Sequence, residues 1–327
     1  MKKLRVGILG CAAIAKRSIA PALAAHPSFQ LTAIASRKTE TAIAFAEQYR
    51  ARPCSYGELV SADDIDLVYC PLPTGLHYEW VEKCLLADKH VLCEKSLACT
   101  YDEVARLVDL ARPRRLLLME SFQFRFHAQN IYVRKLLQDG VIGPVRQVSI
   151  RFGIPPFPEG AVNIRYSNEL GGGALLDNGA YTLKAAHYLL GKDLTVLAAM
   201  SDIDRPNKDG VGDGVDLSGS IMLRAQDGIS VQTAYGFIHY YQNGYEIWGR
   251  DGKITTTRAF TARPDFAAPV IVETVKGKTE QTFQDDHFAN LLTHVSACVE
   301  GQDFEDEYRQ NLLQARLLAD CRSKWSR

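Results

Sequence analysis

The opening residues of the chain constrain its fold more than any other stretch. A short apolar run over residues 4–9 is typical of a buried parallel strand, and it breaks at Gly10. An alanine-rich segment follows, for which the sequence predicts a helix up to Pro21. A strand, a turn of small residues and a helix together present free backbone N–H groups and a positive helix end to a pyrophosphate.

The glycine spacing of a dinucleotide-binding turn is present here only as Gly10, Ala12 and Ala15. This degenerate pattern favours a dinucleotide site, and the alternative is a strand and a helix that merely pack closely together. A lipoprotein signal ending at Cys11 is excluded, because the apolar stretch is too short and Arg5 interrupts it.

Strand and helix patterns alternate through the first 120 residues, with short connections. Such alternation predicts right-handed strand–helix–strand units and a parallel sheet, and a dinucleotide turn belongs on the first strand of such a sheet. We therefore expect an α/β fold that begins with a Rossmann domain over residues 1–120. Thr39 and Thr74 are expected to cap two of its helices. The expected strands are 4–9, 31–35, 67–70, 90–93 and 116–119, and the expected helices are 39–49, 74–87 and 101–111.

The remaining residues, 121–327, predict an α+β domain with a mainly antiparallel sheet. Four dipeptides typical of hairpin turns separate its strand-sized runs, namely Asp227-Gly228, Asn243-Gly244, Asp251-Gly252 and Lys276-Gly277. Helices are expected over 130–139, 174–190, 285–300 and 305–324, a long strand over 145–152, and a Pro- and Gly-rich loop over 153–173. The final helix is expected to pack back on the first domain.

Charge and composition exclude several classes of protein. The formal net charge is zero, with 38 basic and 38 acidic residues, so neither a nucleic acid nor an anionic membrane surface is expected as a partner. No apolar run is long enough to span a bilayer. The 8 cysteines include no Cys-x-x-Cys pair and no metal site is predicted, so we expect reduced thiols in a cytoplasmic protein.

Ser36, Arg37 and Lys38 follow the second predicted strand, where a dinucleotide-binding domain faces the adenosine ribose. An acidic residue at this point would bind the 2′-hydroxyl of NAD, whereas a hydroxyl and two cations suit the 2′-phosphate of NADP. The alternative is an ordinary solvated turn. The three residues therefore favour NADP over NAD.

Another cluster follows the third predicted strand, at the end of the sheet where ligands bind in open α/β folds. It contains Pro71, Leu72, Thr74 and His77. The prolines of this segment fix the backbone. The alternative roles of Thr74 and His77 are a helix cap and a satisfied helical histidine, and the pattern leaves these alternatives open.

A lysine and a helix start complete the candidate chemistry. Lys95 lies in the segment 93–96 after an apolar strand, and it is either surface decoration or an ammonium held by the acidic residue before it. The glycine triplet 171–173 removes side chains where a helix begins, and Asp177 and Tyr181 lie one turn apart on one face of that helix. Each could be a core residue, and together with a lysine from the other domain they could surround a small substrate.

Taken together, these motifs resemble those of the Gfo/Idh/MocA family, named for glucose–fructose oxidoreductase, inositol dehydrogenase and a rhizopine-catabolism protein. The resemblance implies a Rossmann domain followed by a domain for substrate binding and oligomerisation, with an open antiparallel sheet that often forms a dimer interface. It also implies oxidation or reduction of sugars, inositols or related alcohols with NAD(P). It runs over essentially the whole chain, through residues 6–15, Glu94-Lys95, Phe124-Arg125-Phe126-His127, 171–177 and the closing helices.

Individual residues carry the resemblance further. Lys95 matches the lysine of the family's Glu-Lys-Pro motif, which sits between nicotinamide and substrate, and Asp177 matches the aspartate of its Asp-x-x-x-His motif. Tyr181 stands where that histidine would be, as in the glucose–fructose oxidoreductase, dihydrodiol dehydrogenase and nucleotide-sugar ketoreductase branches. Ser96 replaces the proline, which is expected to loosen the loop without removing the lysine. Lys184 replaces an aspartate of the inositol branch and argues against an inositol-type substrate.

The motifs and the resemblance together predict the site residues. Tyr181 is the expected acid–base, and the ordinary tyrosine pKa is about 10, so an ammonium from Lys95 would stabilise its phenolate and could also bind the reacting oxygen. The expected catalytic residues are Lys95, Tyr181 and Asp177, and the expected substrate residues are Arg165, Asp177, Tyr181 and Lys184. The expected cofactor-binding residues are Gly10, Ala12, Ala13, Ile14, Ser36, Arg37, Lys38, Pro71, Leu72, Thr74, His77, Glu94, Lys95 and Arg125.

We therefore expect an NADP-dependent oxidoreductase that transfers a hydride between nicotinamide and a carbon of a sugar, with a keto group on a nucleotide-linked hexose as the favoured substrate. A free-sugar or trans-dihydrodiol dehydrogenase is one alternative. A catalytically silent NADP-binding sensor is another, although the presence of both Lys95 and Tyr181 argues against it. A homodimer or homotetramer is expected, because the second sheet would otherwise expose an apolar face to water.

Overall fold

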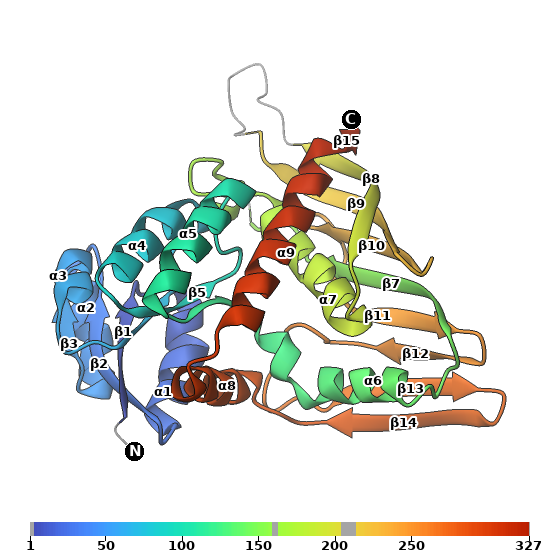
Figure 1. Cartoon of the computed structure of the whole chain (residues 1–327), viewed down its shortest axis with the longest axis horizontal. Helices are drawn as coiled ribbons and strands as arrows, with labels where there is room; N and C mark the ends of the chain where they lie inside the picture. The colour runs from blue at the N-terminus through green and yellow to red at the C-terminus, as the bar shows by residue number, and fades with distance from the viewer. Residues whose placement is uncertain (1–2, 159–162, 204–213, 327) are drawn as a thin grey trace. The chain divides into compact units, whose positions relative to one another are not determined.

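The computed structural model describes residues 3–158, 163–203 and 214–326 (Figure 1). The chain divides into two compact units. Unit 1 contains Met1–Ser121 and Phe288–Ala315, and unit 2 contains Phe122–His287 and Arg316–Arg327. Each unit has its own sheet and its own buried apolar residues. No helix of the described residues has the length and the apolar character needed to cross a membrane.

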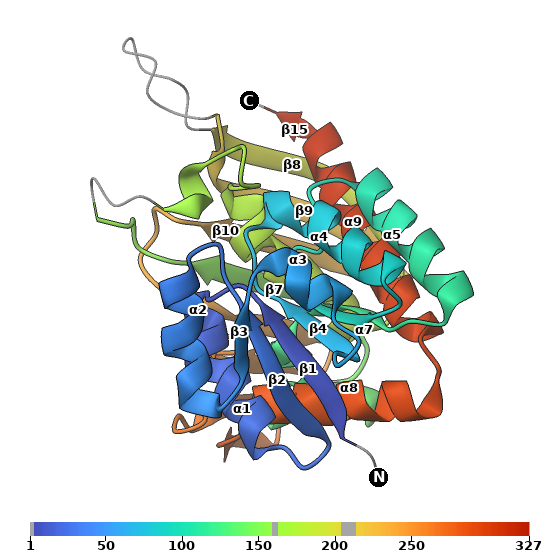
Figure 2. The ribbon, with the colours of Figure 1, turned by 90° about the vertical axis from the view of Figure 1, so that its left-hand side faces the viewer.

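Unit 1 is built on a parallel sheet of six strands, in the order β3-β2-β1-β4-β5-β6. Figure 2 shows β3, β2, β1 and β4 of this sheet. The strand order reverses between β1 and β4, the kind of switch point at which open α/β sheets bind ligands. This order confirms the predicted Rossmann fold. The strands are β1 (Leu4–Leu9), β2 (Phe29–Ala35), β3 (Arg52–Cys54), β4 (Leu67–Cys70), β5 (His90–Glu94) and β6 (Leu118–Ser121).

The central strands are apolar because both of their faces are covered. Val6 and Ile8 of β1 and Val68 of β4 have no exposed surface. A Cβ on Gly7 would lie 3.0 Å from the Leu59 side chain, so the glycine allows the helix α3 (Tyr56–Ser61) to approach β1. Burial of these apolar side chains is the main force that holds the sheet and its helices together.

The helices that alternate with the strands in the first part of the chain pack against this sheet. The sequence pattern predicted all of these helices except α3. Strand β3, which precedes α3, was also missed, because it has only three residues and contains Pro53. The π turn Ala15–Ile19 and α1 (Ala20–Ala25) follow β1. The other helices of unit 1 are α2 (Thr39–Ala46) with a 3₁₀ turn (Glu47–Tyr49), α4 (Thr74–Leu86), α5 (Tyr101–Arg114), α8 (His287–Gly301) and α9 (Glu305–Ser323).

Unit 1 includes α8 and the first half of α9. Within it, Tyr308 of α9 donates a hydrogen bond of 2.5 Å to the carbonyl of Leu116, and the Asn311 side chain donates one of 2.9 Å to the carbonyl of Leu118. These two bonds satisfy one backbone carbonyl of β6 and one just before it, and β6 is an edge strand of the sheet.

The helix that follows β1 continues past Pro21, where the sequence predicted its end. Its π turn Ala15–Ile19 leads directly into α1, and the N–H of Ala20 bonds to the carbonyl of Ala15, five residues back. The wider turn accommodates the proline, whose nitrogen has no hydrogen to donate.

Two predicted helix caps are wrong. Thr39 and Thr74 are each the first residue inside their helix, and neither helix start has a side-chain cap bond. Ser55 and Thr100 instead cap α3 and α5, each as part of a reciprocal capping box with a glutamate three residues later.

Unit 2 contains a sheet of nine strands in the order β14-β13-β12-β11-β7-β10-β9-β8-β15. Most neighbours are antiparallel, as predicted, whereas β7 with β10 and β8 with β15 are parallel pairs, so the sheet is mixed. Helix α6 (Ala128–Gln138) packs on β13 and β14, and α7 (Ala180–Leu190) packs on β7 and β10 (Figure 1). The strands are β7 (Val145–Gly153), β8 (Leu194–Ile203), β9 (Asp216–Ala225), β10 (Ser230–Gly236), β11 (Gln242–Gly249), β12 (Gly252–Thr256), β13 (Ala268–Thr274), β14 (Gly277–Phe283) and β15 (Trp325–Ser326).

Three of the four predicted hairpin dipeptides connect antiparallel strands, namely Asp227-Gly228, Asp251-Gly252 and Lys276-Gly277. The prediction for Asn243-Gly244 is wrong, since both residues lie inside β11. The Asn243 side chain accepts a hydrogen bond from the Phe260 N–H at 2.9 Å and donates one to Thr261 at 2.7 Å. A Cβ on Gly244 would lie 2.3 Å from the Thr256 carbonyl, so this glycine serves the close approach of two backbones.

Candidate active site

Gly10 ends β1 with a φ of 124°, a conformation that favours glycine. A Cβ there would lie 2.9 Å from the Leu72 side chain, so any larger residue would collide with the segment after β4. Ala13 is exposed, and Ala12 and Ile14 are half-buried where the helix starts. The N–H groups of such a helix start lack partners within the helix, and small side chains allow a pyrophosphate to approach them.

Ser36, Arg37 and Lys38 lie beside this turn. The Gly10 N–H donates to the carbonyl of Ala35 at 3.0 Å, which brings the residues after β2 next to the end of β1. Ser36 is half-buried and accepts a hydrogen bond from the Lys38 N–H at 3.2 Å, while the Arg37 and Lys38 side chains are exposed. Two cations and a hydroxyl therefore stand where the dinucleotide fold meets the adenosine ribose, with no carboxylate among them.

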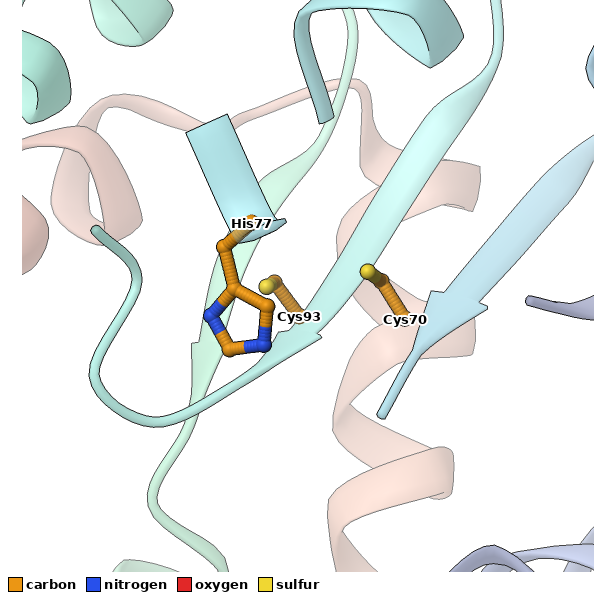
Figure 3. Close-up of side chains that lie close together, drawn as sticks. All are labelled: Cys70, His77 and Cys93. Atoms are coloured by element: carbon orange, nitrogen blue, oxygen red, sulfur yellow. The ribbon is translucent and has the colours of Figure 1, made fainter. Parts of the chain in front are cut away.

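Cys70, His77 and Cys93 bring three potential metal-ligand atoms within 4.8 Å of one another (Figure 3). All three residues are buried, at the ends of β4 and β5 and in the first turn of α4. Both ring nitrogens of His77 lie against carbonyl oxygens, Nδ1 at 2.8 Å from Ser96 and Nε2 at 2.7 Å from Leu72. A metal could reach His77 only by displacing one of these contacts, so the donor set does not fit a metal in this geometry.

The contact of His77 with the cofactor stays a prediction, and the structure gives its ring contacts with two backbone carbonyls. The residue has no exposed surface, and burial lowers the pKa of its ring to about 4. A neutral imidazole donates one hydrogen bond, so the ring at neutral pH joins the two loops through one donated bond and one close contact. His77 therefore positions Leu72 and Ser96. The peptide bond between Lys95 and Ser96 is cis.

Lys95 lies in a loop whose two sides are held by buried groups. On one side the Tyr69 hydroxyl donates to Glu94 at 2.8 Å. Burial raises the pKa of the Glu94 carboxyl, and the Tyr69 hydrogen bond and the Lys95 ammonium oppose that rise. On the other side the Glu120 carboxylate accepts a hydrogen bond from the Leu97 N–H at 2.9 Å. The backbone that carries the lysine is thus fixed from strands β4 and β6.

In unit 2, the predicted substrate residues Arg165 and Asp177 form an ion pair. Arg165 Nε lies 2.5 Å from Asp177 Oδ2, and the two side chains are 37% and 18% exposed. The Asp177 carboxylate raises the pKa of the guanidinium, and the Arg165 guanidinium carbon lies 5.2 Å from the centre of the Phe157 ring. A short 3₁₀ helix (Ile164–Tyr166) and a π turn (Leu175–Gly179) position the pair.

Tyr181 is the second residue of α7 and is 7% exposed. The Gln123 side-chain amide donates a hydrogen bond of 3.2 Å to its hydroxyl. The ring lies 5.3 Å from Phe122, 5.3 Å from Phe152 and 5.8 Å from Phe260, measured between centroids. These contacts fix the ring, and an amide partner suits a hydroxyl that changes protonation, since it can both donate and accept.

The other predicted residues are placed in both units. Lys184 of α7 is 1% exposed, and its ammonium lies 5.5 Å from the centre of the Phe122 ring. Arg125 is 8% exposed and lies 5.0 Å over the Phe126 ring. In unit 1, Pro71 and Leu72 are buried and Thr74 is half-buried. The structure therefore gathers one set of predicted residues at the strand ends of unit 1 and another around α7 of unit 2.

Sequence reasoning missed Gln123 and the rings that surround Tyr181. Gln123 directly precedes Phe124-Arg125-Phe126-His127, so its position beside a recognised motif was an available signal. Phe152 lies at the end of the strand predicted over 145–152, directly before the Pro- and Gly-rich loop. Phe260 offered no local signal, because only the sheet of unit 2 brings it to α7.

Models of known protein families match both parts of the chain. The model described as "Oxidoreductase family, NAD-binding Rossmann fold" matches residues 4–122, and the model described as "GFO/IDH/MocA C-terminal domain" matches residues 131–255. The two matches together cover most of unit 1 and of the sheet of unit 2.

Individual proteins are similar over most or nearly all of the chain. The dTDP-3,4-didehydro-2,6-dideoxy-alpha-D-glucose 3-reductase of Saccharopolyspora spinosa is 45% identical over 274 residues, which are 83% of this chain and 80% of that one. The enzyme of the same name from Actinomadura kijaniata is 39% identical over 97% of this chain and 94% of its own. The crystal structure of a 3-ketoreductase from Actinomadura kijaniata, in complex with NADP and TDP-benzene, superimposes with a TM-score of 0.92 at 37% identity and covers 99% of this chain and 98% of that one.

Proposed function

The chain belongs to the GFO/IDH/MocA family of oxidoreductases, and from that premise we propose that it is an NADPH-dependent reductase of a keto group on a nucleotide-linked deoxyhexose. The observation that carries this proposal is the full-length likeness to dTDP-sugar 3-reductases, 39% identical over 97% of the chain. The proposed substrate is a thymidine diphosphate sugar with a ketone at carbon 3.

The residues at the end of β1 and β2 support NADP as the cofactor. Gly10 lets the end of β1 pack closely against Leu72, and the small residues after it leave the helix start accessible to a pyrophosphate. The exposed Arg37 and Lys38 can bind a 2′-phosphate, and Ser36 adds a hydroxyl in place of the acidic residue that would repel it.

The proposed chemistry assigns each residue a distinct role. When bound, NADPH supplies a hydride from C4 of its nicotinamide to the carbonyl carbon. Tyr181 donates its hydroxyl proton to the carbonyl oxygen, which completes the alcohol and leaves a phenolate that is reprotonated from solvent. Lys95 donates a hydrogen bond to the same oxygen and stabilises the negative charge that develops there.

Gln123 and Asp177 support these roles in unit 2. The Gln123 amide donates to the Tyr181 hydroxyl oxygen at 3.2 Å and so holds that oxygen in place. Asp177 orients Arg165 through their ion pair, and the Arg165 guanidinium is a donor for the polar groups of a sugar nucleotide. Lys184, buried one turn beyond Tyr181, adds a positive charge that favours the phenolate.

An enzymatic assay tests the proposal. The purified protein is mixed with NADPH and with a dTDP-linked 3-ketohexose, and the loss of NADPH absorbance is followed. We expect turnover that is much faster with NADPH than with NADH, and slower turnover with free aldoses or a trans-dihydrodiol in the presence of NADP. NADPH binding without turnover of any of these compounds would contradict the proposal and favour a sensor.

The same proposal includes a cytoplasmic homodimer or homotetramer. All eight cysteines are free thiols, as expected for a reducing compartment. Met200, Met222 and Trp248 are 63%, 48% and 47% exposed, and strand register puts them on one face of the sheet of unit 2. Exposed apolar side chains on one sheet face favour association with a second copy.

A further inference from the structure

The helix that carries Asp177 and Tyr181 starts at a glycine turn that also holds the Arg165 segment. The Gly172 N–H donates to the carbonyl of Ser167 at 2.8 Å, and the Gly173 N–H donates to the carbonyl of Arg165 at 2.9 Å. A Cβ on Gly172 would lie 2.5 Å from the Arg165 carbonyl oxygen. The Arg165 backbone therefore lies directly on the turn, and the position of one depends on the other.

Asp216, the first residue of β9, lies on the buried side of this turn. It is 4% exposed, and its Oδ2 accepts a hydrogen bond of 2.6 Å from the N–H of Leu175, from which it is separated by 41 residues. Its other oxygen, Oδ1, is 2.3 Å from the place where a Cβ on Gly173 would stand. One carboxylate thus occupies the space behind the turn and binds the first amide of the helix.

The helix has no other side-chain cap at this end. Its N-cap residue, Ala174, makes no side-chain hydrogen bond, so Asp216 takes the part that Ser, Thr or Asp usually plays locally. Burial raises the pKa of Asp216 to about 6, and the Leu175 N–H and the Arg322 guanidinium oppose that rise. At neutral pH the carboxylate is therefore ionised, and its charge suits the positive end of the helix.

We propose that Asp216 is a positioning residue that fixes the start of this helix, and through the glycine turn the Arg165–Asp177 pair, for the reaction at Tyr181. The inference rests on the proposed reductase function. Asp177 lies two residues beyond Leu175, and its N–H bonds to the Gly173 carbonyl at 3.3 Å, so loosening the first turn moves Asp177 and Arg165 together. Tyr181 follows in the same continuous helix. Asp216 itself contacts neither cofactor nor substrate in this assignment.

Three variants test the inference. Asp216→Ala removes the acceptor, Asp216→Asn keeps one oxygen at the same position, and Gly173→Ala places a methyl group against Oδ1. Gly191→Ala is the matched control, because Gly191 ends the same helix with a φ of 60° and has no atom within 4 Å of an added Cβ. Gly173 has a φ of 106°, so both alanine variants place a side chain at a positive φ, and only Gly173→Ala touches Asp216.

The first readout is steady-state kinetics with the dTDP-linked ketosugar. We expect kcat of Asp216→Ala to fall by about 10²-fold, the scale of a misplacement of about 1 Å. The KM for NADPH should stay within about twofold, because the residues proposed to bind it are in unit 1, apart from Arg125. Asp216→Asn should retain an intermediate kcat, Gly173→Ala should resemble Asp216→Ala, and Gly191→Ala should keep the kcat of the unaltered protein.

The second readout, hydrogen exchange of the Leu175 amide, does not depend on activity. We expect exchange about tenfold faster or more in Asp216→Ala, with β1 and β4 of unit 1 unchanged. Failure of the unaltered protein to reduce the ketosugar contradicts the proposed function. In that case, hydrogen exchange of the Leu175 amide still tests the contact between Asp216 and Leu175. An active Asp216→Ala with unchanged kcat overturns the positioning role. If Asp216→Ala does not fold, Asp216→Asn and Gly173→Ala decide the question by the same two readouts.

Discussion

The side-chain amide of Gln123 donates a hydrogen bond of 3.2 Å to the hydroxyl of Tyr181, inside a group of phenylalanine rings. The rings hold the tyrosine by packing. The Gln123 amide, in the first residues of unit 2, gives the hydroxyl a polar contact. Removal of the hydroxyl therefore leaves the ring contacts in place. This separation makes it possible to test chemistry apart from folding.

Tyr181→Phe should lower kcat by about 10²–10⁴-fold, the range for a lost general acid. The affinity for NADPH should barely change, because the ring is retained. We would measure kcat per folded molecule beside thermal stability. Tyr188→Phe is the control, since it removes a hydroxyl from the same helix, one that bonds to the carbonyl of Arg125 at 2.8 Å. Normal turnover by Tyr181→Phe would end the assignment.

Lys95→Ala should reduce both kcat and the productive placement of the nicotinamide, because one ammonium serves both. Lys95→Arg keeps the charge and should lose less. The kcat of the double variant Lys95→Ala/Tyr181→Phe should be little lower than that of the poorer single variant, because the effects of residues that act as a unit are not additive. Full additivity of the two losses in kcat would show that the residues act independently.

Arg37→Ala should narrow the preference for NADPH over NADH by about 1–3 kcal/mol, the scale of a charge-assisted hydrogen bond. Calorimetric titration of both cofactors would measure it. Arg146→Ala, an exposed arginine on β7 of unit 2, controls for the loss of one positive charge. The unaltered protein must itself prefer NADPH, and equal affinities for the two cofactors would refute the role given to Ser36, Arg37 and Lys38.

His294 should make stability depend on pH. Its Nε2 lies 3.4 Å from the Cys298 sulfur and 3.0 Å from Glu307 Oε1, and these hydrogen bonds raise the pKa of the ring from 6.5 to about 9. A raised histidine pKa contributes stability that is complete below pH 6.5 and is lost as the pH rises through about 9. Because the side chain is 36% exposed, solvent screening reduces the expected loss to about 1 kcal/mol.

Urea unfolding of the unaltered protein and of His294→Gln at several pH values between these limits would measure this effect. The difference in unfolding free energy between the two proteins should shrink as the pH rises. Cys298→Ser keeps the Glu307 pair and should retain part of the dependence. Parallel curves for the unaltered protein and His294→Gln would show that the pair does not contribute.

Light scattering at micromolar concentration should show a dimer or a larger assembly. Met200→Asp with Met222→Asp should dissociate it, because two charges would replace apolar side chains on the exposed sheet face. Val275→Asp is the control, since Val275 is 95% exposed in the turn between β13 and β14. A monomer from the unaltered chain would contradict the proposed interface.

The sequence predicted well those strands and helices that depend on residues close together along the chain. The apolar run of β1, the alternation that follows it and the helix that carries Tyr181 all result from local periodicity, and the structure confirms them. The Asn243-Gly244 dipeptide was misread, because the contacts that hold it in β11 come from Thr256 and Phe260. A turn dipeptide and a strand glycine look alike until the partner strand is known.

The same distinction applies to the site: single residues could be predicted, but contacts between distant residues could not. Arg165 and Asp177 could be proposed singly, but their ion pair could not, because a loop of unpredictable path brings them together. Asp216 lies far from Leu175 along the chain, and only the sheet makes it a helix cap. Polar partners that cross such separations leave no periodic signal in one sequence.

The π turn at Leu175–Gly179 gives the helix one residue more than regular winding would use. Each residue of an α-helix advances by about 100° around its axis, so without the wider turn the extra residue would rotate every side chain after it. The start is tied to Asp216 and the end is closed at Gly191, so a one-residue deletion here could not be absorbed at either terminus. The π turn itself would absorb the deletion by returning to regular α winding, which keeps Tyr181 facing Gln123, whereas a further inserted residue would rotate Tyr181 away. The number of residues before Tyr181 thus determines the direction of its side chain.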